Sequence, residues 1–252
     1  MRVLVTGGLG FIGSSVAESL LNQGHQVLSI DNLDSYYDPN VKLNNMKELS
    51  KHKNFKAEIF DIGNSEKMIE ALQSWKPEVI FHAAGKAGVR TSLKNPRSYV
   101  YSNIEVLTSL LESMRICDLK KLVFCSSSSV YGAREEQSMS EDIGFDQAIS
   151  FYATSKQCGE LINRMYHNLY GFSVLNLRFF TAYGPKQRPD LAIHKFLKAS
   201  IKSEPITMFG DGSMKRDYTY IDDIVDGVCK SIERVVAKDE ILYETYNLGN
   251  SV

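Results

Sequence analysis

The sequence predicts an α/β fold, a doubly wound parallel sheet with helices on both faces. Three observations lead to this prediction. Short apolar runs alternate with longer amphipathic segments through the first two-thirds of the 252 residues, as in a parallel sheet whose strands are joined by crossover helices. The first apolar run, Val3 to Val5, leads into glycines spaced G-x-x-G-x-x-G. The second run ends at an acidic residue, Asp31, about twenty residues beyond those glycines.

The glycine turn lies between the first strand and an amphipathic helix that ends near Asn22. Strand, glycine turn and helix in this order are typical of the Rossmann dinucleotide-binding fold. The glycines let the chain turn tightly, so that free N–H groups at the helix N-terminus face a pyrophosphate. The residues of this turn that we expect to contact the cofactor are Gly7, Gly10, Phe11, Ile12 and Gly13. The alternative is an ordinary tight turn between a strand and a helix.

The second strand, expected over 25–30, ends at Asp31 and Asn32, both of which we expect to contact the cofactor. A carboxylate at this place accepts hydrogen bonds from the adenosine ribose hydroxyls and repels a 2′-phosphate. No arginine or lysine stands beside Asp31 in the sequence, so we expect nothing to offset that repulsion. The sequence therefore favours NAD over NADP as the cofactor. The alternative is that the Asp-Asn pair only forms a turn.

Strands and helices continue to alternate up to Cys125. In order, we expect helix 41–50, strand 55–60, helix 65–75, strand 78–82, helix 98–116 and strand 122–125. The third strand ends at Asp61-Ile62, on the ligand edge of a parallel sheet, so we expect Asp61 to contact the adenine and Ile62 to belong to the cofactor site. A helix cap is the alternative for Asp61. After the fourth strand, the small residues Ala83 and Ala84 allow a cofactor to approach the backbone closely.

The later elements are less regular. We expect helix 151–170, strand 173–177, helix 192–201, strand 206–209, a turn at 210–212, helix 221–236 and strand 246–248. Because the simple alternation breaks after Tyr183, we assign residues 1–183 to a cofactor-binding domain that is rejoined by about 217–252. Residues 184–216 then belong to a small substrate-binding lobe.

Composition excludes several classes of protein. A net charge of −1 and a pI near 6.5 argue against a nucleic-acid partner held by bulk charge. The four scattered cysteines indicate buried free thiols in a reducing compartment, so we expect the cytoplasm. The five histidines have no metal-ligand spacing, and we expect no metal. No apolar run reaches membrane-spanning length, and the N-terminus has no signal-peptide layout, so we expect no membrane partner.

Tyr152 and Lys156 form a Tyr-x-x-x-Lys pair in the helix expected over 151–170. Residues four apart share a helix face, so both side chains can point into one cleft. A lysine cation would lower the pKa of the tyrosine and give a base usable near neutral pH. The serine run 126–129, at the end of the fifth strand, would supply a hydroxyl for a substrate oxygen. The alternatives are an exposed helix pair and an ordinary serine loop.

The sequence resembles the extended short-chain dehydrogenase/reductases, within the NAD-dependent nucleotide-sugar epimerases, over essentially its whole length. The matching segments are Thr6–Gly13, Asp61-Ile62, Ser126–Gly132, Tyr152 with Lys156, Leu177–Pro185 and Arg216–Asp223. The resemblance implies that Tyr152 is the catalytic base and acid, and that Lys156 assists it and also holds the nicotinamide ribose. It further implies that Ser127 is the catalytic Ser/Thr and that Arg216 contacts the diphosphate of the nucleotide.

Within this family, the chain is most similar to the UDP-glucuronate 4-epimerases. Dehydratases carry Asp-Glu directly after the catalytic Thr, and UDP-xylose-type decarboxylases carry Glu, whereas Ser128-Ser129 stand here. The segments shared with UDP-glucuronate 4-epimerases are Asp31–Asp38, Ala87–Ser92, which includes Arg90, and Arg188–Asp190. Dehydration is therefore disfavoured, and an epimerase is expected.

The resemblance also implies a set of substrate contacts. They are Arg90, Ser127, Ser128, Thr181, Arg188 and Arg216, of which Ser127, Ser128, Thr181 and Arg188 surround the sugar carboxylate. A guanidinium is a suitable neighbour for a carboxylate, although Arg188 could instead be a surface charge. Gly85-Lys86 and Lys186-Gln187 depart from the pattern of the subgroup, so UDP-glucose and UDP-N-acetylglucosamine stay as alternative substrates.

The implied activity is NAD-dependent C4 epimerisation of a UDP-sugar through a 4-keto intermediate, in polysaccharide biosynthesis. The resemblance also implies a homodimer, formed by helices around 98–116 and 151–170. Members of the family continue for several dozen residues beyond the equivalent of Val252, so we expect the small lobe to be incomplete here. The alternative from a different class is a protein that binds NAD without turnover.

Overall fold

The protein is built on a parallel sheet with the strand order β3-β2-β1-β4-β5-β6-β9. The computed structural model describes residues 1–132, 139–145, 147–207, 211–212, 215–237 and 240–250. The strands of the sheet are β1 (Arg2–Thr6), β2 (Gln26–Asp31), β3 (Phe55–Ile59), β4 (Val79–His82), β5 (Lys121–Ser127), β6 (Ser173–Phe179) and β9 (Tyr243–Leu248). All neighbouring pairs run parallel, which confirms the predicted doubly wound sheet.

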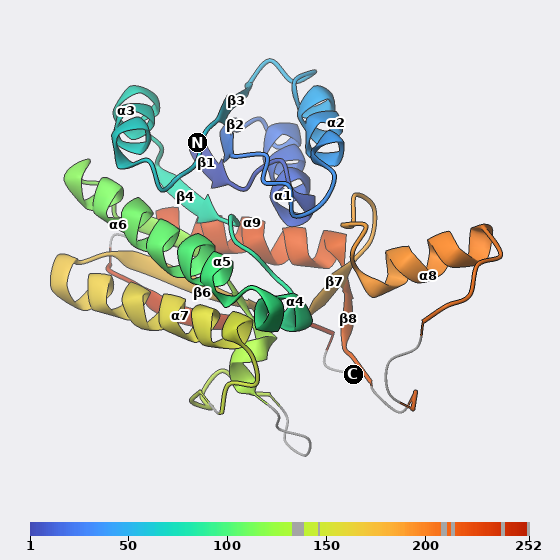
Figure 1. Ribbon diagram of the computed structural model, residues 1–252. Helices are drawn as coiled ribbons and strands as arrows, with labels where there is room; N and C mark the ends of the chain where they lie inside the picture. Colours follow the sequence, from blue (N-terminus) through green and yellow to red (C-terminus); the bar gives the residue numbers. More distant parts are fainter. Residues whose placement is uncertain (133–138, 146, 208–210, 213–214, 238–239, 251–252) are drawn as a thin grey trace.

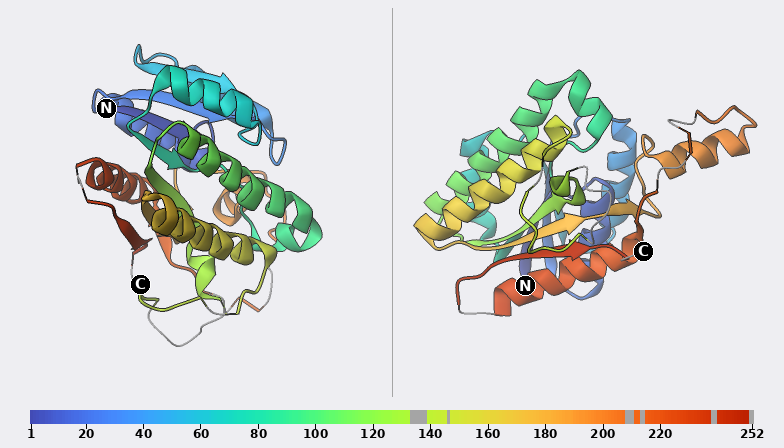
Figure 2. Two further views of the ribbon diagram at one scale, coloured as in Figure 1. Left: turned by 90° about the vertical axis from the view of Figure 1, so that its left-hand side faces the viewer. Right: turned by 90° about the horizontal axis from the view of Figure 1, so that it is seen from below.

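Helices cover both faces of this sheet (Figures 1 and 2). One face carries α1 (Phe11–Asn22), α2 (Pro39–Leu49) and α9 (Ile221–Ala237). The other carries α3 (Ser65–Trp75), α6 (Val106–Ile116) and α7 (Phe151–Tyr170). Each strand therefore packs against a helix layer on both sides, and this explains why the strands read as continuous apolar runs.

The first strand shows how the two halves of the core are separated. Val3 and Val5 point into the core beneath α1 and α9, whereas Leu4 points into the core beneath α3 and α6. All three side chains are fully buried. Successive residues of a strand face opposite sides, so a short apolar run fills both core layers at once.

The long helix expected over 98–116 is wrong in part. The segment begins earlier and is divided into α4 (Val89–Lys94), α5 (Pro96–Val100), a π-helical turn, η1 (Tyr101–Glu105), and α6. Pro96 occupies the first turn of α5, and the Asn95 side chain caps it by accepting from the Ser98 N–H. π-Helical turns often occur at functional sites. This one lies close to the carboxyl ends of the strands, because Tyr101 donates to Asp61, after β3, and Asn103 accepts from Lys86, after β4.

The region after Phe179 departs from the simple alternation. It contains β7 (Thr181–Tyr183), which pairs in parallel with β8 (Tyr218–Tyr220), and α8 (Ala192–Ile201). No residue of α8 is buried, and the helix projects away from the sheet (Figures 1 and 2). Residues 206 and 207 are not in the strand expected there. The remainder of that expected strand, and the first residue of the turn expected at 210–212, lie outside the described residues.

Candidate active site

The predicted cofactor and catalytic residues meet at the carboxyl-terminal edge of the sheet. Thr6, Asp31, His82 and Ser127 are the last residues of β1, β2, β4 and β5. The strand order reverses between β1 and β4, because the chain first builds the sheet outward through β2 and β3 and then returns. In parallel sheets such a switch point opens the crevice where ligands bind.

The glycine turn is shaped for close approach of backbone to backbone. Gly7 has a φ of +64°, and a Cβ atom placed on it would lie 2.7 Å from the backbone nitrogen of Ala84. A Cβ on Gly13 would collide with the carbonyl oxygen of Gly7. Helix α1 begins after Gly10 with no side-chain cap, so its N-terminus can offer N–H groups to a phosphate. These residues fit a dinucleotide pyrophosphate.

The Asp31 carboxylate is buried and accepts several hydrogen bonds from within the protein. Its Oδ1 atom accepts from the Leu33 N–H at 2.9 Å and from Lys42 Nζ at 2.9 Å, and its Oδ2 accepts from the Leu9 N–H at 3.3 Å. The expectation that no cation offsets the charge of Asp31 is therefore wrong. Lys42 is not a sequence neighbour of Asp31, but it lies in α2, from which its side chain reaches back to the end of β2. Asp38 and Pro39, which cap and begin α2, are the sequence signals that could have placed Lys42 one turn inside a helix.

Asp61 lies at the same edge, after β3. Its carboxylate accepts from the Asn32 side-chain amide at 2.9 Å, the Tyr101 hydroxyl at 2.9 Å and the Gly63 N–H at 2.8 Å. It does not cap α3, because that cap is Asn64. The Ile62 side chain is buried in the core, so only its backbone is available to a cofactor.

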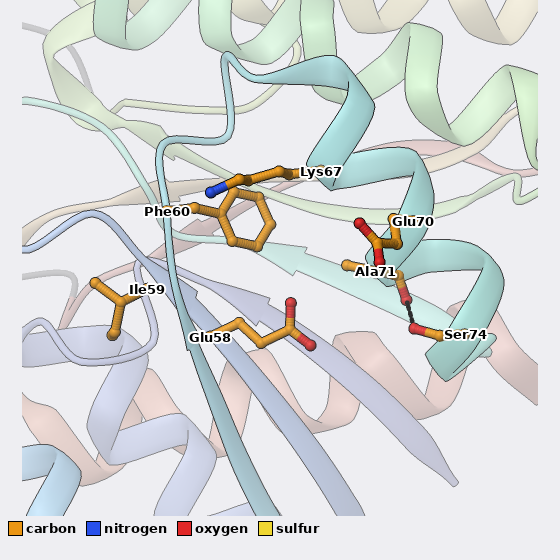
Figure 3. A pocket seen from close by; sticks show the side chains of 7 residues that line it. All are labelled: Glu58, Ile59, Phe60, Lys67, Glu70, Ala71 and Ser74. Atoms are coloured by element: carbon orange, nitrogen blue, oxygen red, sulfur yellow. Dashed lines mark hydrogen bonds between the residues drawn. The ribbon is translucent and has the colours of Figure 1, made fainter.

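A surface hollow of about 330 Å³ lies just outside this edge, between β3 and α3 (Figure 3). Its lining side chains are Glu58, Ile59, Phe60, Lys67, Glu70, Ala71 and Ser74. None of the predicted site residues belongs to this lining. The charged side chains of the lining are Glu58 from β3 and Lys67 and Glu70 from α3.

Ser127, Tyr152 and Lys156 are brought together by β5 and the first turns of α7. Ser150 caps α7 by accepting from the Ala153 N–H, which starts the helix just before Tyr152. Lys156 is 6% exposed, and its Nζ donates to the carbonyl oxygen of Cys125, in the strand that ends at Ser127, at 2.7 Å. The Tyr152–Lys156 pair therefore faces inward toward β5 and is not the exposed helix pair that was the alternative.

The protonation behaviour of this group follows from burial. Burial raises the pKa of Tyr152, and a hydrogen bond with Ser127 acts in the opposite direction. Burial also lowers the pKa of Lys156. Burial destabilises the charged form of each group. A positive charge placed beside Tyr152 acts in the opposite direction and favours its phenolate. The site therefore offers a hydroxyl, a phenol and an amine at one place, as a proton-transfer site requires.

Asn103 is a buried site residue that the sequence analysis did not predict. Its amide donates to the Lys86 carbonyl oxygen at 2.9 Å and to Ser155 Oγ at 2.8 Å, and its Oδ1 accepts from the Lys86 N–H at 2.7 Å. It lies in the π-helical turn η1. Asn103 therefore fixes the loop after Ala84 against the helix that carries Tyr152 and Lys156. The residues around it give no local signal for this role.

Arg188 lies in the same crevice and is mostly buried. Asp190 binds it through two bonds, Nε to Oδ1 at 2.9 Å and Nη2 to Oδ2 at 2.7 Å. The guanidinium lies 5.2 Å from the centroid of the Tyr36 ring. Burial raises the pKa of Tyr152, and the positive charge of Arg188 partly opposes this by lowering it. With its side chain 16% exposed, Arg188 is not a surface charge.

The remaining predicted contacts are less enclosed. Ser128, in the 3₁₀ turn η2 (Ser128–Tyr131), and Thr181, in β7, are half-buried. Arg90 on α4 and Arg216 before β8 are exposed, and Arg216 Nη1 donates to the Lys215 carbonyl oxygen at 2.6 Å. These two arginines do not pack into the buried group around Tyr152.

Two further findings concern only the part of the chain that the structure describes. No group of three His, Cys, Asp or Glu side chains there is arranged to hold a metal ion. No helix there is both long and apolar enough to cross a membrane.

Known proteins resemble this chain in sequence and structure. The model of the NAD dependent epimerase/dehydratase family matches residues 3–249. A UDP-glucuronate 4-epimerase from Thermodesulfobacterium geofontis is 43% identical over 246 residues, covering 98% of this chain and 74% of that protein. UDP-glucuronic acid 4-epimerase from Bacillus cereus, solved with UDP-glucuronic acid and NAD, has a TM-score of 0.91 at 37% identity, covering 99% of this chain and 78% of that one. UDP-glucose 4-epimerase from Thermotoga maritima, solved with UDP-glucose, has a TM-score of 0.87 at 29% identity, covering 100% of this chain and 78% of that one.

Proposed function

Because the chain belongs to the NAD dependent epimerase/dehydratase family, we propose that it is an NAD-dependent UDP-sugar 4-epimerase whose preferred substrate is UDP-glucuronate. One observation carries this proposal: Ser127, Tyr152 and Lys156 meet beside the glycine turn at the ligand edge of the sheet. The product from UDP-glucuronate is UDP-galacturonate.

The residues at the edge of the sheet fit NAD. The glycine turn and the uncapped start of α1 would hold the pyrophosphate, Asp31 would hold the adenosine ribose, and Lys156 would hold the nicotinamide ribose. When bound, NAD supplies the hydride acceptor for C4 of the sugar and then returns the hydride. The other steps belong to side chains of this chain.

Tyr152, as the phenolate, removes the proton from the sugar 4-hydroxyl while C4 loses its hydride, and this leaves a 4-keto sugar. Ser127 donates a hydrogen bond to the same oxygen. The nearby Lys156 ammonium stabilises the phenolate. After the keto sugar has turned over, hydride returns to its opposite face and Tyr152 gives the proton back to O4. Atoms and charge balance over the cycle, so the net reaction is inversion at C4.

The pH profile tests the role of Ser127. Because the Ser127 hydrogen bond lowers the pKa of Tyr152 against the effect of burial, Ser127→Ala raises that pKa. Only the phenolate acts as the base, so the acid limb of the kcat/KM profile, which reports the free enzyme, is expected to move to higher pH. The measurement is kcat/KM against pH for the wild type and Ser127→Ala. A profile of Ser127→Ala that loses amplitude without moving would contradict this role.

The sugar preference rests on Arg188. Asp190 uses the Nε hydrogen and one Nη2 hydrogen, and the remaining guanidinium hydrogens can bind the sugar carboxylate. Ser127, Ser128 and Thr181 add hydroxyls around the same place. UDP-glucose and UDP-N-acetylglucosamine, which lack the carboxylate, are the alternative substrates.

Arg188→Gln is expected to lower kcat/KM for UDP-glucuronate by about 10- to 100-fold, the effect of losing a charge-assisted contact. Because the Arg188 charge also lowers the pKa of Tyr152, both sugars are compared at a pH above the acid limb of each protein, and any conversion of UDP-glucose should then change much less. The control is Arg216→Gln, which removes a proposed diphosphate contact and should weaken all UDP-sugars alike. Equal losses for charged and neutral sugars in Arg188→Gln would remove the argument for UDP-glucuronate.

We also assign a homodimer interface to the outer face of α7. Leu161, Met165 and Leu169 are 55%, 45% and 65% exposed and lie four residues apart, forming one apolar stripe on a helix that lies beside α6. Leu161→Glu with Leu169→Glu is expected to convert a dimer to a monomer in light scattering after size exclusion. Leu197→Glu, on the exposed α8, is the control and should leave the dimer intact. A wild-type monomer would contradict the assignment.

Two finer assignments complete the proposal. We place the enzyme in the cytoplasm, supported by its four free cysteines, Cys117, Cys125, Cys158 and Cys229. We assign residues 1–183 with 217–252 to the cofactor domain, supported by β9 completing the main sheet, and 184–216 to the small lobe, supported by the position of α8.

Proton NMR of the purified protein with UDP-glucuronate and no added reductant tests the function directly. Appearance of the anomeric signal of UDP-galacturonate supports the proposal. Conversion of only UDP-glucose or UDP-N-acetylglucosamine keeps the mechanism and changes the sugar. A protein that binds NAD and converts none of the three is instead a binding protein without turnover.

A further inference from the structure

We propose that Lys42 is a second residue that binds the adenosine ribose, and that the Asp31–Lys42 ion pair sets the preference for NAD over NADP. The proposal deepens the cofactor use of the proposed function and rests on it. Sequence reasoning considered Asp31 alone, whereas the structure pairs Asp31 with a buried ammonium.

Lys42 is held in place by the start of α2. The Asp38 side chain caps this helix by accepting from the Asn40 N–H, and Pro39 occupies its first turn. Lys42 then points back to β2, with its Nζ 2.9 Å from Asp31 Oδ1 and 5.6 Å from the centroid of the Tyr37 ring. The Lys42 and Asp31 side chains are 11% and 2% exposed. The pair therefore lies inside the cofactor edge.

Counting hydrogen bonds shows why Asp31 alone is insufficient for a ribose. A carboxylate offers about four acceptor positions. Three are occupied, two on Oδ1 by Leu33 and Lys42 and one on Oδ2 by Leu9. One position on Oδ2 remains for a ribose hydroxyl, but a ribose presents two adjacent hydroxyls. The Lys42 ammonium has three hydrogens, only one of which is needed for Asp31, so it can donate to the second hydroxyl oxygen.

The charge of the pair has a separate consequence. An isolated carboxylate would repel the 2′-phosphate of NADP strongly. At 2.9 Å, Lys42 neutralises Asp31, so the net charge facing that phosphate is close to zero. The wild-type protein should consequently reject NADP less strongly than Asp31 alone would.

A purely structural ion pair is the competing interpretation. Helix α2 is also fixed to the glycine turn through Asn45, whose Nδ2 donates to the Leu9 carbonyl oxygen at 2.9 Å. That bond does not involve Lys42, so removing the ammonium leaves a second contact between α2 and the turn. A replacement that preserves the length of the Lys42 side chain can therefore separate cofactor binding from folding.

The test is calorimetric titration of the full chain with NAD and with NADP, using wild type, Lys42→Met and Asp31→Asn. In Lys42→Met, NADP is expected to weaken more than NAD, raising the ratio Kd(NADP)/Kd(NAD) by about tenfold or more. In Asp31→Asn, the unopposed ammonium should lower that ratio below the wild-type value by about tenfold or more.

The control is Lys47→Met, on an exposed position of the same helix, which should leave both constants unchanged. Thermal melting confirms that each variant is folded. A folded Lys42→Met protein with the wild-type ratio would overturn the proposal and make the pair structural. Binding requires no turnover, so this outcome is distinct from a failure of the proposed epimerase activity, which NMR would show as absence of product.

Discussion

Replacing Tyr152 with phenylalanine is expected to lower kcat for C4 epimerisation by about 10³-fold, with little change in NAD affinity. The substitution removes only the phenolic hydroxyl, which is the proposed proton acceptor and donor at O4. The ring itself packs edge-on against Tyr99, with centroids 6.3 Å apart, and this contact is retained. The loss should therefore appear in turnover and not in cofactor binding.

Two measurements are needed for this prediction. Turnover is followed by NMR with UDP-glucuronate, and NAD affinity by calorimetry on the same preparation. Tyr170→Phe removes a hydroxyl from an exposed tyrosine at the end of the same helix, α7, and should keep wild-type kcat. Normal turnover in Tyr152→Phe would remove Tyr152 from the mechanism, whatever the substrate proves to be.

Much of the fold was predictable because buried parallel strands consist of short apolar runs, which can be recognised in the sequence. Residues 3–5 and 122–125 are examples, and both are buried in the sheet. The glycine turn was predictable because glycine spacing is a local pattern: a positive φ favours glycine at Gly7, and a Cβ there would lie only 2.7 Å from the backbone nitrogen of Ala84. The family and the cofactor, inferred from such motifs, are confirmed by the comparisons.

Two of the failures share a physical cause, which is contact between side chains of different elements. The helix expected over 98–116 is interrupted where Asn103 bonds to Lys86 and Ser155. Lys42 reaches back from α2 to Asp31 at the end of β2. Periodicity and propensity describe one segment at a time, and tertiary contacts of this kind override them.

The second large effect is expected from Arg178, which forms a buried ion pair with Glu160 beneath the catalytic group. The side chains are 6% and 4% exposed, and Arg178 Nη2 lies 2.8 Å from Glu160 Oε2. Ser126, next to Ser127, donates its hydroxyl to Glu160, and Arg178 Nη1 donates to the Tyr131 hydroxyl at 2.9 Å. The pair therefore joins β5, α7 and β6 at the point where the site is assembled.

Arg178→Met should lower the free energy of unfolding by about 3 to 5 kcal/mol, because it leaves the Glu160 carboxylate buried without its cation. Denaturant unfolding measures the change. The double variant Arg178→Met with Glu160→Met removes both charges and should recover most of the loss, since an apolar pair of similar volume is often as stable as a buried ion pair. Lys230→Met breaks an exposed pair with Asp226 and should change stability very little. If the double variant is no more stable than Arg178→Met, the cost comes from lost packing and lost hydrogen bonds, of Arg178 to Tyr131 and in the double variant also of Glu160 to Ser126, and not from an unpaired charge.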